Sequence, residues 1–254
     1  MKHRVVLSVC AALLCLTAAG CSGSSSGKPE PAGTASSSVT APETTGAPEE
    51  LTLTVSGTGQ QFGEDDTPLT DALLDTLQKR RFTAEAEIYE QNELIGKMLL
   101  EVSGDNIHYK TERVPSTLYK DTPAFGVQDS ECIFIGAEAY SQKNGEWKKE
   151  TWRSPYFSGS DPSGSGLIGL FFESGPLERY DFQVKSREEA ADGSVTESFA
   201  VNKSHVLSVT YDAEGHLRSS VYGVTEQRFT KFADEAGEIT APQVKEESGT
   251  AAAQ

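Results

Sequence analysis

The sequence predicts an α+β protein that is mostly β: a curled antiparallel sheet, or half-barrel, of about 8–10 strands covered by one or two helices. Two observations lead to this fold class. From residue 82 onward apolar side chains recur at every second position between turn residues, which is typical of strands with one buried face. Over 68–79 the apolar residues recur at a spacing of four, which indicates one amphipathic helix. A long sheet with one apolar face must curl or be covered, and this helix is the obvious cover.

The first twenty residues have the features of an export signal. Lys2 and Arg4 are basic, residues 5–16 are almost wholly apolar, and small residues at 18–20 precede Cys21. The apolar run is too short for a permanent membrane-spanning helix, which needs about 20 residues. We therefore expect residues 1–20 to be a signal peptide.

The residues before Cys21 resemble the bacterial lipobox, with Ala18 in place of the preferred Leu. The resemblance implies cleavage between Gly20 and Cys21 and thioether diacylation of Cys21. It places the protein on the extracytoplasmic face of the cell membrane, held there by its lipid. The alternative is a plain secretory signal that leaves Cys21 as a free thiol.

Charge and cysteine content exclude two classes of protein. The chain has a net charge of −16, and loss of Lys2 and Arg4 with the signal makes it −18. Nucleic acid would repel so acidic a chain, so we expect no nucleic-acid partner. Cys132 is the one cysteine left inside the mature domain, which rules out an internal disulfide. Because Cys132 starts an apolar run, we expect a buried, inert thiol.

The remaining chain divides into a linker, one domain and a tail. Residues 21–50 hold the anchored cysteine and a Ser/Pro/Thr-rich linker that has almost nothing to bury, so we expect it to be disordered. A flexible coil of this length spans roughly 30 Å. The domain extends over 51–243, and 244–254 is expected to be a disordered tail.

The helix at 68–79 has a beginning and an end that the sequence marks. Thr67 or Asp66 is the expected cap, and Pro68 occupies the first turn. Cations at 79–81 suit the negative end of the helix dipole. The apolar stripe consists of Leu69, Leu73, Leu74 and Leu77.

The first meander of strands follows this helix. Alternating runs over 82–110 are separated by turn residues, and the pattern resumes over 131–142. Asn144-Gly145 is the strongest hairpin signal in the chain. After a Gly/Ser/Pro-rich loop, the apolar patch 167–172 predicts one or two helical turns, and we leave open whether it is a gate over a cavity or a plug of the core.

A second meander occupies the C-terminal part of the domain. Apolar alternation begins at Tyr180 and continues to Val224, interrupted by turns at Asp192-Gly193 and Glu214-Gly215. Phe229 and Phe232 complete the pattern. Together the two meanders supply the expected sheet.

The residues give no sign of catalysis or metal binding. His108, His205 and His216 are scattered and lack the spacing of a zinc site. The acids at 64–66 precede a helix, where carboxylates suit the dipole. Because no nucleophile lies near a base, we expect neither an enzyme nor a cofactor nor a bound metal.

Three short sequence segments resemble segments of lipoproteins that have the Lol-type carrier fold, which is an unclosed β-barrel covered by helices. They are 136–140 before the turn at 144–148, the hairpin 211–217, and the ending 239–242. The resemblance covers about 67–243 and implies a cavity for acyl chains between sheet and helices. It transfers no binding residue.

Two hypotheses of function follow. The first is a membrane-tethered module that binds a hydrophobic or amphiphilic ligand, such as a lipid, between sheet and helix. The expected lining residues are Leu73, Leu77, Met98, Leu100, Phe134, Leu170 and Phe182. The second is a structural or sensory envelope lipoprotein that binds an unknown protein through an exposed patch near Trp147. In the second case the interior is filled.

Overall fold

The computed structural model describes residues 50–53, 63–201 and 203–244. The expected signal peptide, the anchor Cys21, nearly all of the linker and the tail beyond residue 244 lie outside these residues.

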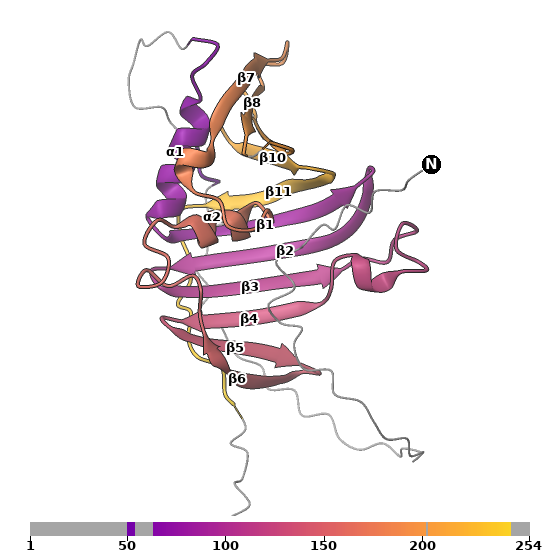
Figure 1. Cartoon of the computed structure of the whole chain (residues 1–254), viewed down its shortest axis with the longest axis vertical. Coiled ribbons are helices and arrows are strands. Elements are labelled where there is room, and N and C mark those ends of the chain that lie inside the picture. The colour runs from indigo at the N-terminus through magenta and orange to yellow at the C-terminus, as the bar shows by residue number, and fades with distance from the viewer. Residues whose placement is uncertain (1–49, 54–62, 202, 245–254) are drawn as a thin grey trace, which may run out of the picture.

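One antiparallel sheet of eleven strands forms the body of the domain, in the order β6-β5-β4-β3-β2-β1-β11-β10-β9-β8-β7 (Figure 1). The sheet curls but does not close between its edge strands, which confirms the predicted half-barrel with eleven strands in place of eight to ten. The strands are β1 (Arg81–Glu90), β2 (Glu93–Ser103), β3 (Asn106–Arg113), β4 (Ser130–Ile135), β5 (Glu138–Lys143), β6 (Glu146–Arg153), β7 (Gln183–Glu189), β8 (Val195–Ala200), β9 (Val206–Tyr211), β10 (Leu217–Tyr222) and β11 (Thr225–Ala233).

Two α-helices lie close together beside the sheet, α1 (Pro68–Gln78) and α2 (Ser165–Phe171) (Figure 1). The leucine stripe of α1 is buried, as its spacing predicts. Two single turns of 3-10 helix, η2 (Pro123–Phe125) and η3 (Arg179–Asp181), lie in connecting segments. Both predicted helical segments are therefore present.

The register of the central strand β1 sets which side chains face the helices. Ala84 lies opposite Leu100 of β2 on one side and Phe232 of β11 on the other, and all three are buried. Glu85, one position along the strand, points to the outer face and is exposed. Thr83, on the other side of Ala84, is buried, and its hydroxyl donates to the Glu235 carbonyl at 2.7 Å. The predicted apolar face of this strand is confirmed, since Phe82, Ala84, Ala86 and Ile88 are all buried.

The predicted hairpin at Asn144-Gly145 joins β5 to β6. Both residues have positive φ, 53° and 78°. A two-residue hairpin turn of this kind needs positive φ at both positions, which Asn and Gly supply with the least strain.

An aromatic cluster centred on Phe171 fills the hollow of the sheet. The Phe171 ring stacks on Phe229 at 5.2 Å and meets Phe82 at 5.9 Å and Phe232 at 5.7 Å between centroids. Its neighbour Phe172 lies 5.0 Å away. These rings place the C-terminal end of α2 inside the core.

The expectation that a side chain of Thr67 or Asp66 caps α1 is wrong. Thr67 occupies the N-cap position, but neither it nor Asp66 caps the helix with its side chain. The carboxylate of Asp66 instead accepts a hydrogen bond from the Gly63 nitrogen at 2.7 Å. The acceptor for the first turn comes from strand β8, since Glu197 receives the nitrogens of Leu69 and Thr70.

Candidate ligand-binding pocket

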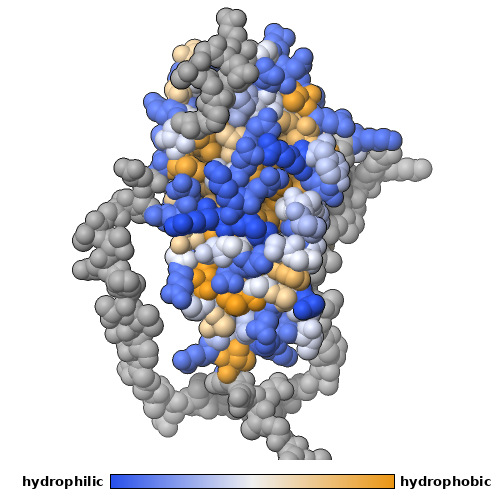
Figure 2. Space-filling model, turned by 90° about the vertical axis from the view of Figure 1, so that its left-hand side faces the viewer, coloured by the Kyte–Doolittle hydropathy of each residue, from blue (hydrophilic) through white to orange (hydrophobic). Residues whose placement is uncertain are grey.

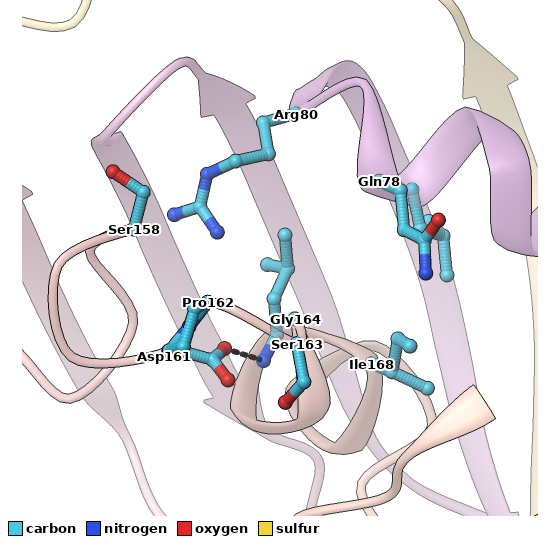
Figure 3. Close-up of a pocket in the computed structure, with 10 residues that line it drawn as sticks. Gln78, Arg80, Ser158, Asp161, Pro162, Ser163, Gly164 and Ile168 are labelled. Carbon is cyan, nitrogen blue, oxygen red and sulfur yellow. Dashed lines mark hydrogen bonds between the residues drawn. The ribbon is translucent and has the colours of Figure 1, made fainter. Parts of the chain in front are cut away.

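A pocket of about 460 Å³ lies between the end of α1, the start of α2 and the loop that leads to α2 (Figure 3). Its volume falls within the range of about 300–1,000 Å³ that is usual for small-molecule sites. The lining residues are Leu77, Gln78, Arg80, Ser158, Asp161, Pro162, Ser163, Gly164, Leu167 and Ile168.

The pocket has an apolar floor and a polar rim. Leu77, Leu167 and Ile168 form the floor and belong to the hydrophobic core. The rim carries the guanidinium of Arg80 and the hydroxyls of Ser158 and Ser163. Such a lining suits a molecule that has both apolar and polar parts.

Arg80 fixes one side of the rim. Its Nε donates to the Gly104 carbonyl at 2.9 Å, and its Nη2 donates to the Tyr156 carbonyl. Its Nε also lies 3.5 Å from the Asp105 carboxylate. The backbone nitrogen and hydroxyl of Ser158 donate to Asp105 and, together with Arg80, hold the pKa of that carboxyl below its usual value. The end of α1, the β2–β3 turn and the loop before α2 are thus tied together.

Asp161 organises the start of α2. Its side chain is buried, and Oδ2 accepts a hydrogen bond from the Leu167 nitrogen at 3.1 Å (Figure 3). Gly164 precedes the helix with a φ of 72°, a left-handed conformation that glycine adopts without strain. The pocket wall formed by α2 is therefore held at its first turn.

The other end of α2 is held by a buried amide on β11. The Gln227 Nε2 donates to the Phe171 carbonyl at 3.2 Å and approaches the Met98 sulfur at 3.6 Å. The Ser220 hydroxyl in turn donates to Gln227 Oε1 at 2.8 Å. These bonds satisfy a polar side chain in an apolar core, as burial requires.

The seven expected lining residues all lie in or against one continuous core. Leu77 also lines the pocket. Leu73, Met98, Leu100, Phe134 and Leu170 are at most 4% exposed. Phe182 is half-buried, and its ring contacts Phe199 at 5.2 Å. The apolar patch 167–172 is buried throughout, so it plugs the core in this conformation.

The pocket also includes residues that the sequence did not indicate. Arg80, Ser158 and Asp161 are ordinary polar residues in a helix end and a Gly/Ser/Pro-rich loop. No spacing marks them, because the fold alone brings them together.

Comparison with known proteins gives a likeness of fold. No protein-family model and no curated protein matches the chain. The structure is similar to LprF from Mycobacterium bovis, with a TM-score of 0.36 and 11% identity over 71% of this chain and 99% of that one. It is also similar to the lipoprotein LppX from Mycobacterium tuberculosis, with a TM-score of 0.34 and 10% identity over 68% of this chain and 97% of that one. The likeness to mycobacterial lipoproteins concerns the fold alone, and no ligand or residue role is transferred from it.

Two clusters of titratable groups lie away from the pocket. His108 on β3 bridges Glu101 on β2 at 2.8 Å and Glu131 on β4 at 3.0 Å. The hydrogen bond with Glu101, supported by Glu131, raises the pKa of His108 against the opposing effect of burial. These contacts join three strands on the outer face.

The second cluster is in the turn between β9 and β10. Asp212, Glu214 and His216 are placed closely enough to share an ion. Asp212 already accepts hydrogen bonds from Arg218 and from the backbone of His216, and with these its pKa falls to about 2 despite partial burial. The cluster thus has a structural explanation, and we assign no metal to it.

Among the described residues, no helix has the length and apolar character needed to cross a membrane. Figure 2 shows the side of the molecule that carries α1, where hydrophobic residues surface in small patches among hydrophilic ones.

Proposed function

We propose that this protein is a membrane-tethered, extracytoplasmic lipoprotein whose domain binds a hydrophobic or amphiphilic ligand. The observation that carries the proposal is the mixed lining of the pocket between α1 and α2. Its floor of Leu77, Leu167 and Ile168 suits an apolar group, and its rim offers polar groups at the mouth.

Binding would begin with the apolar part of the ligand on this floor. Each Å² of apolar surface removed from water contributes about 25 cal/mol. The floor continues directly into the core around Leu73, Leu170 and Phe171. A longer chain would enter this core by displacing α2, which supplies two of the three floor residues.

The anchor is part of the same proposal. A diacylated Cys21 followed by a flexible linker would keep the pocket within roughly 30 Å of the membrane that supplies an amphiphile. Metabolic labelling with a fatty acid tests it: label is expected in the wild type and not in Cys21→Ser, and an unlabelled wild type contradicts it.

The pocket is tested by purifying the full chain from a membrane source and examining it by native mass spectrometry and lipid extraction. Ile168→Trp fills the pocket, whereas Val224→Trp adds the same ring at a site that is 66% exposed in the β10–β11 turn. We expect a bound amphiphile in the wild type and in Val224→Trp, and its loss in Ile168→Trp. A wild type that carries no ligand, or an Ile168→Trp variant that folds and keeps it, contradicts the proposal.

A second candidate function is a structural or sensory role through protein contacts. Phe125 favours it, because this ring is 75% exposed in the long loop between β3 and β4. Cross-linking in cells tests this role. One specific protein neighbour that is lost in Phe125→Ala is expected, and unchanged cross-links contradict it.

A further inference from the structure

The Asp161 carboxylate in the wall of the pocket uses only one of its two oxygens. The residue is 7% exposed, and Oδ2 accepts the hydrogen bond of 3.1 Å from the Leu167 nitrogen (Figure 3). Within the described part of the chain no group donates to Oδ1, which is not fully enclosed by protein atoms. So secluded an oxygen needs a donor from water or from a ligand. Because Asp161 lines the pocket, a molecule bound there can supply one.

Two other polar groups of the lining have hydrogen atoms to donate. The Ser163 oxygen, two positions along the same loop, accepts the Ser165 nitrogen at 3.4 Å, and its own proton goes to no described residue. The side-chain amide of Gln78, at the end of α1, is exposed and likewise makes no hydrogen bond with a described residue. The pocket therefore presents a free carboxylate oxygen together with free donors.

The charges around the pocket disfavour a charged ligand head. The charge of Arg80 is already matched by Asp105, whose oxygen lies 3.5 Å from its Nε. Asp161 forms no ion pair with any described residue, so an anionic head would add negative charge beside an uncompensated carboxylate. A cationic head would instead share the lining with the Arg80 guanidinium. Like charges in so confined a site repel each other strongly.

Hydrogen bonding leads to the same class of head. A phosphate or ester oxygen only accepts hydrogen bonds, and a quaternary ammonium neither donates nor accepts them. A hydroxyl group does both, so it alone among these matches a carboxylate acceptor that lies near free donors.

We infer that Asp161 selects the ligand of this pocket, and that the ligand is an amphiphile with an uncharged head that carries hydroxyl groups. One hydroxyl would donate to Asp161 Oδ1 and accept from Ser163 or Gln78, while the acyl chain lies on the apolar floor. This inference rests on the proposed function and names the chemical class of the ligand.

The inference is tested with four amphiphiles of equal chain length that differ in the head. They are monolauroylglycerol, methyl laurate, dodecyl phosphate and dodecyltrimethylammonium. Binding to the full chain is measured by calorimetry below the micelle concentration of each. The chain carries Cys21→Ser, which removes the expected acylation site, so no detergent is needed. Monolauroylglycerol should bind about tenfold more tightly than the other three, the factor that one hydrogen bond to a charged group supports.

Asp161→Asn removes the free acceptor with little change of shape. The amide oxygen can still accept from the Leu167 nitrogen, whereas the amide nitrogen cannot accept from a ligand. We expect the preference for monolauroylglycerol to disappear and dodecyl phosphate to bind more tightly than in the wild type. Asp192→Asn is the matched control, since it removes the same charge from an exposed carboxylate in the β7–β8 turn, where Asp192 accepts from Ser194. This variant should keep the wild-type preference.

The outcomes separate this inference from the proposed function. A wild type that binds the four heads equally, or binds dodecyl phosphate or the ammonium most tightly, overturns the role of Asp161 and leaves the pocket as a ligand site. A folded Asp161→Asn variant that keeps the wild-type preference overturns it as well. If Asp161→Asn does not fold, the wild-type series still decides. A wild type that binds none of the four contradicts the proposed function itself, and the inference with it.

Discussion

The carboxylate of Glu197 on β8 accepts a hydrogen bond of 2.8 Å from the backbone nitrogen of Thr70, in the first turn of α1. The same carboxylate receives the Leu69 nitrogen at 3.4 Å and lies 3.6 Å from Arg187. The Thr70 hydroxyl also pairs with the buried Tyr211 hydroxyl at 2.9 Å. Glu197, which is 127 positions from Thr70 in the sequence, therefore caps the first turn of α1. This contact fixes α1 to the C-terminal half of the sheet.

Glu197→Ala should therefore destabilise the domain. It leaves two buried backbone nitrogens without their acceptor, which costs about 1–3 kcal/mol each when no water replaces it. We expect a loss of about 3 kcal/mol in the free energy of unfolding by urea. Glu188→Ala, on the adjacent strand β7 and exposed, should change it by less than about 0.5 kcal/mol. Equal losses in both variants would show that the cap has no energetic role.

The bridge from Glu101 through His108 to Glu131 predicts a pH-dependent stability. Because the pKa of His108 is raised, its contribution is full below about pH 6.5 and is lost as the pH rises through the raised value. A double-mutant cycle of His108→Gln with Glu101→Gln should give a coupling of about 0.5–1 kcal/mol at pH 5.5 and less at pH 9. A coupling that grows with pH would contradict this assignment.

Gly169→Ala tests the close contact between α2 and the turn after it. The new methyl group would lie 1.8 Å from a backbone oxygen, so the helix or the turn must move. Overpacking of this kind costs about 3 kcal/mol, which should appear as a large fall in the melting temperature. At Gly237 a Cβ meets nothing within 4 Å, so Gly237→Ala should melt close to the wild type. A Gly169→Ala variant as stable as that control would contradict the close packing.

Phe171 should be among the most costly side chains to truncate. It is fully buried and has four aromatic neighbours, so Phe171→Ala loses apolar contacts and leaves a cavity. Loss of a buried phenylalanine costs about 3–5 kcal/mol. Phe125→Ala removes the same ring from an exposed site and should change the urea midpoint little. Similar midpoints for the two variants would mean that α2 does not plug the core.

The local patterns predicted most elements of this fold because their causes are local. The leucine spacing predicted α1, and the alternation of period two predicted most of the strands. Asn144-Gly145 predicted the hairpin between β5 and β6. Strand β7 was harder to delimit, since it is an edge strand with exposed residues and a weak alternation.

The long-range features were not predictable from these patterns. The pairing of β1 with β11 joins strands from opposite ends of the domain, and periodicity says nothing of partners. In the sequence, Glu197 looks like an ordinary polar residue of a strand. Its role at the start of α1 depends on the packing of α1 against β8, which the sequence pattern does not show. In the candidate site, Leu77 was expected from its apolar stripe, whereas Arg80 and Asp161 acquire their roles only when the loop before α2 folds against α1.

The strand count has a consequence for the seam of the half-barrel. Every neighbouring pair in the sheet is antiparallel, and eleven is an odd number. The edge strands β6 and β7 therefore run in the same direction, and joining them would need a parallel ladder that differs from every other pairing in the sheet. The opening between β6 and β7 is therefore a consequence of the strand order. However strongly the sheet curls, these two edge strands cannot pair in the antiparallel way that all other neighbours use.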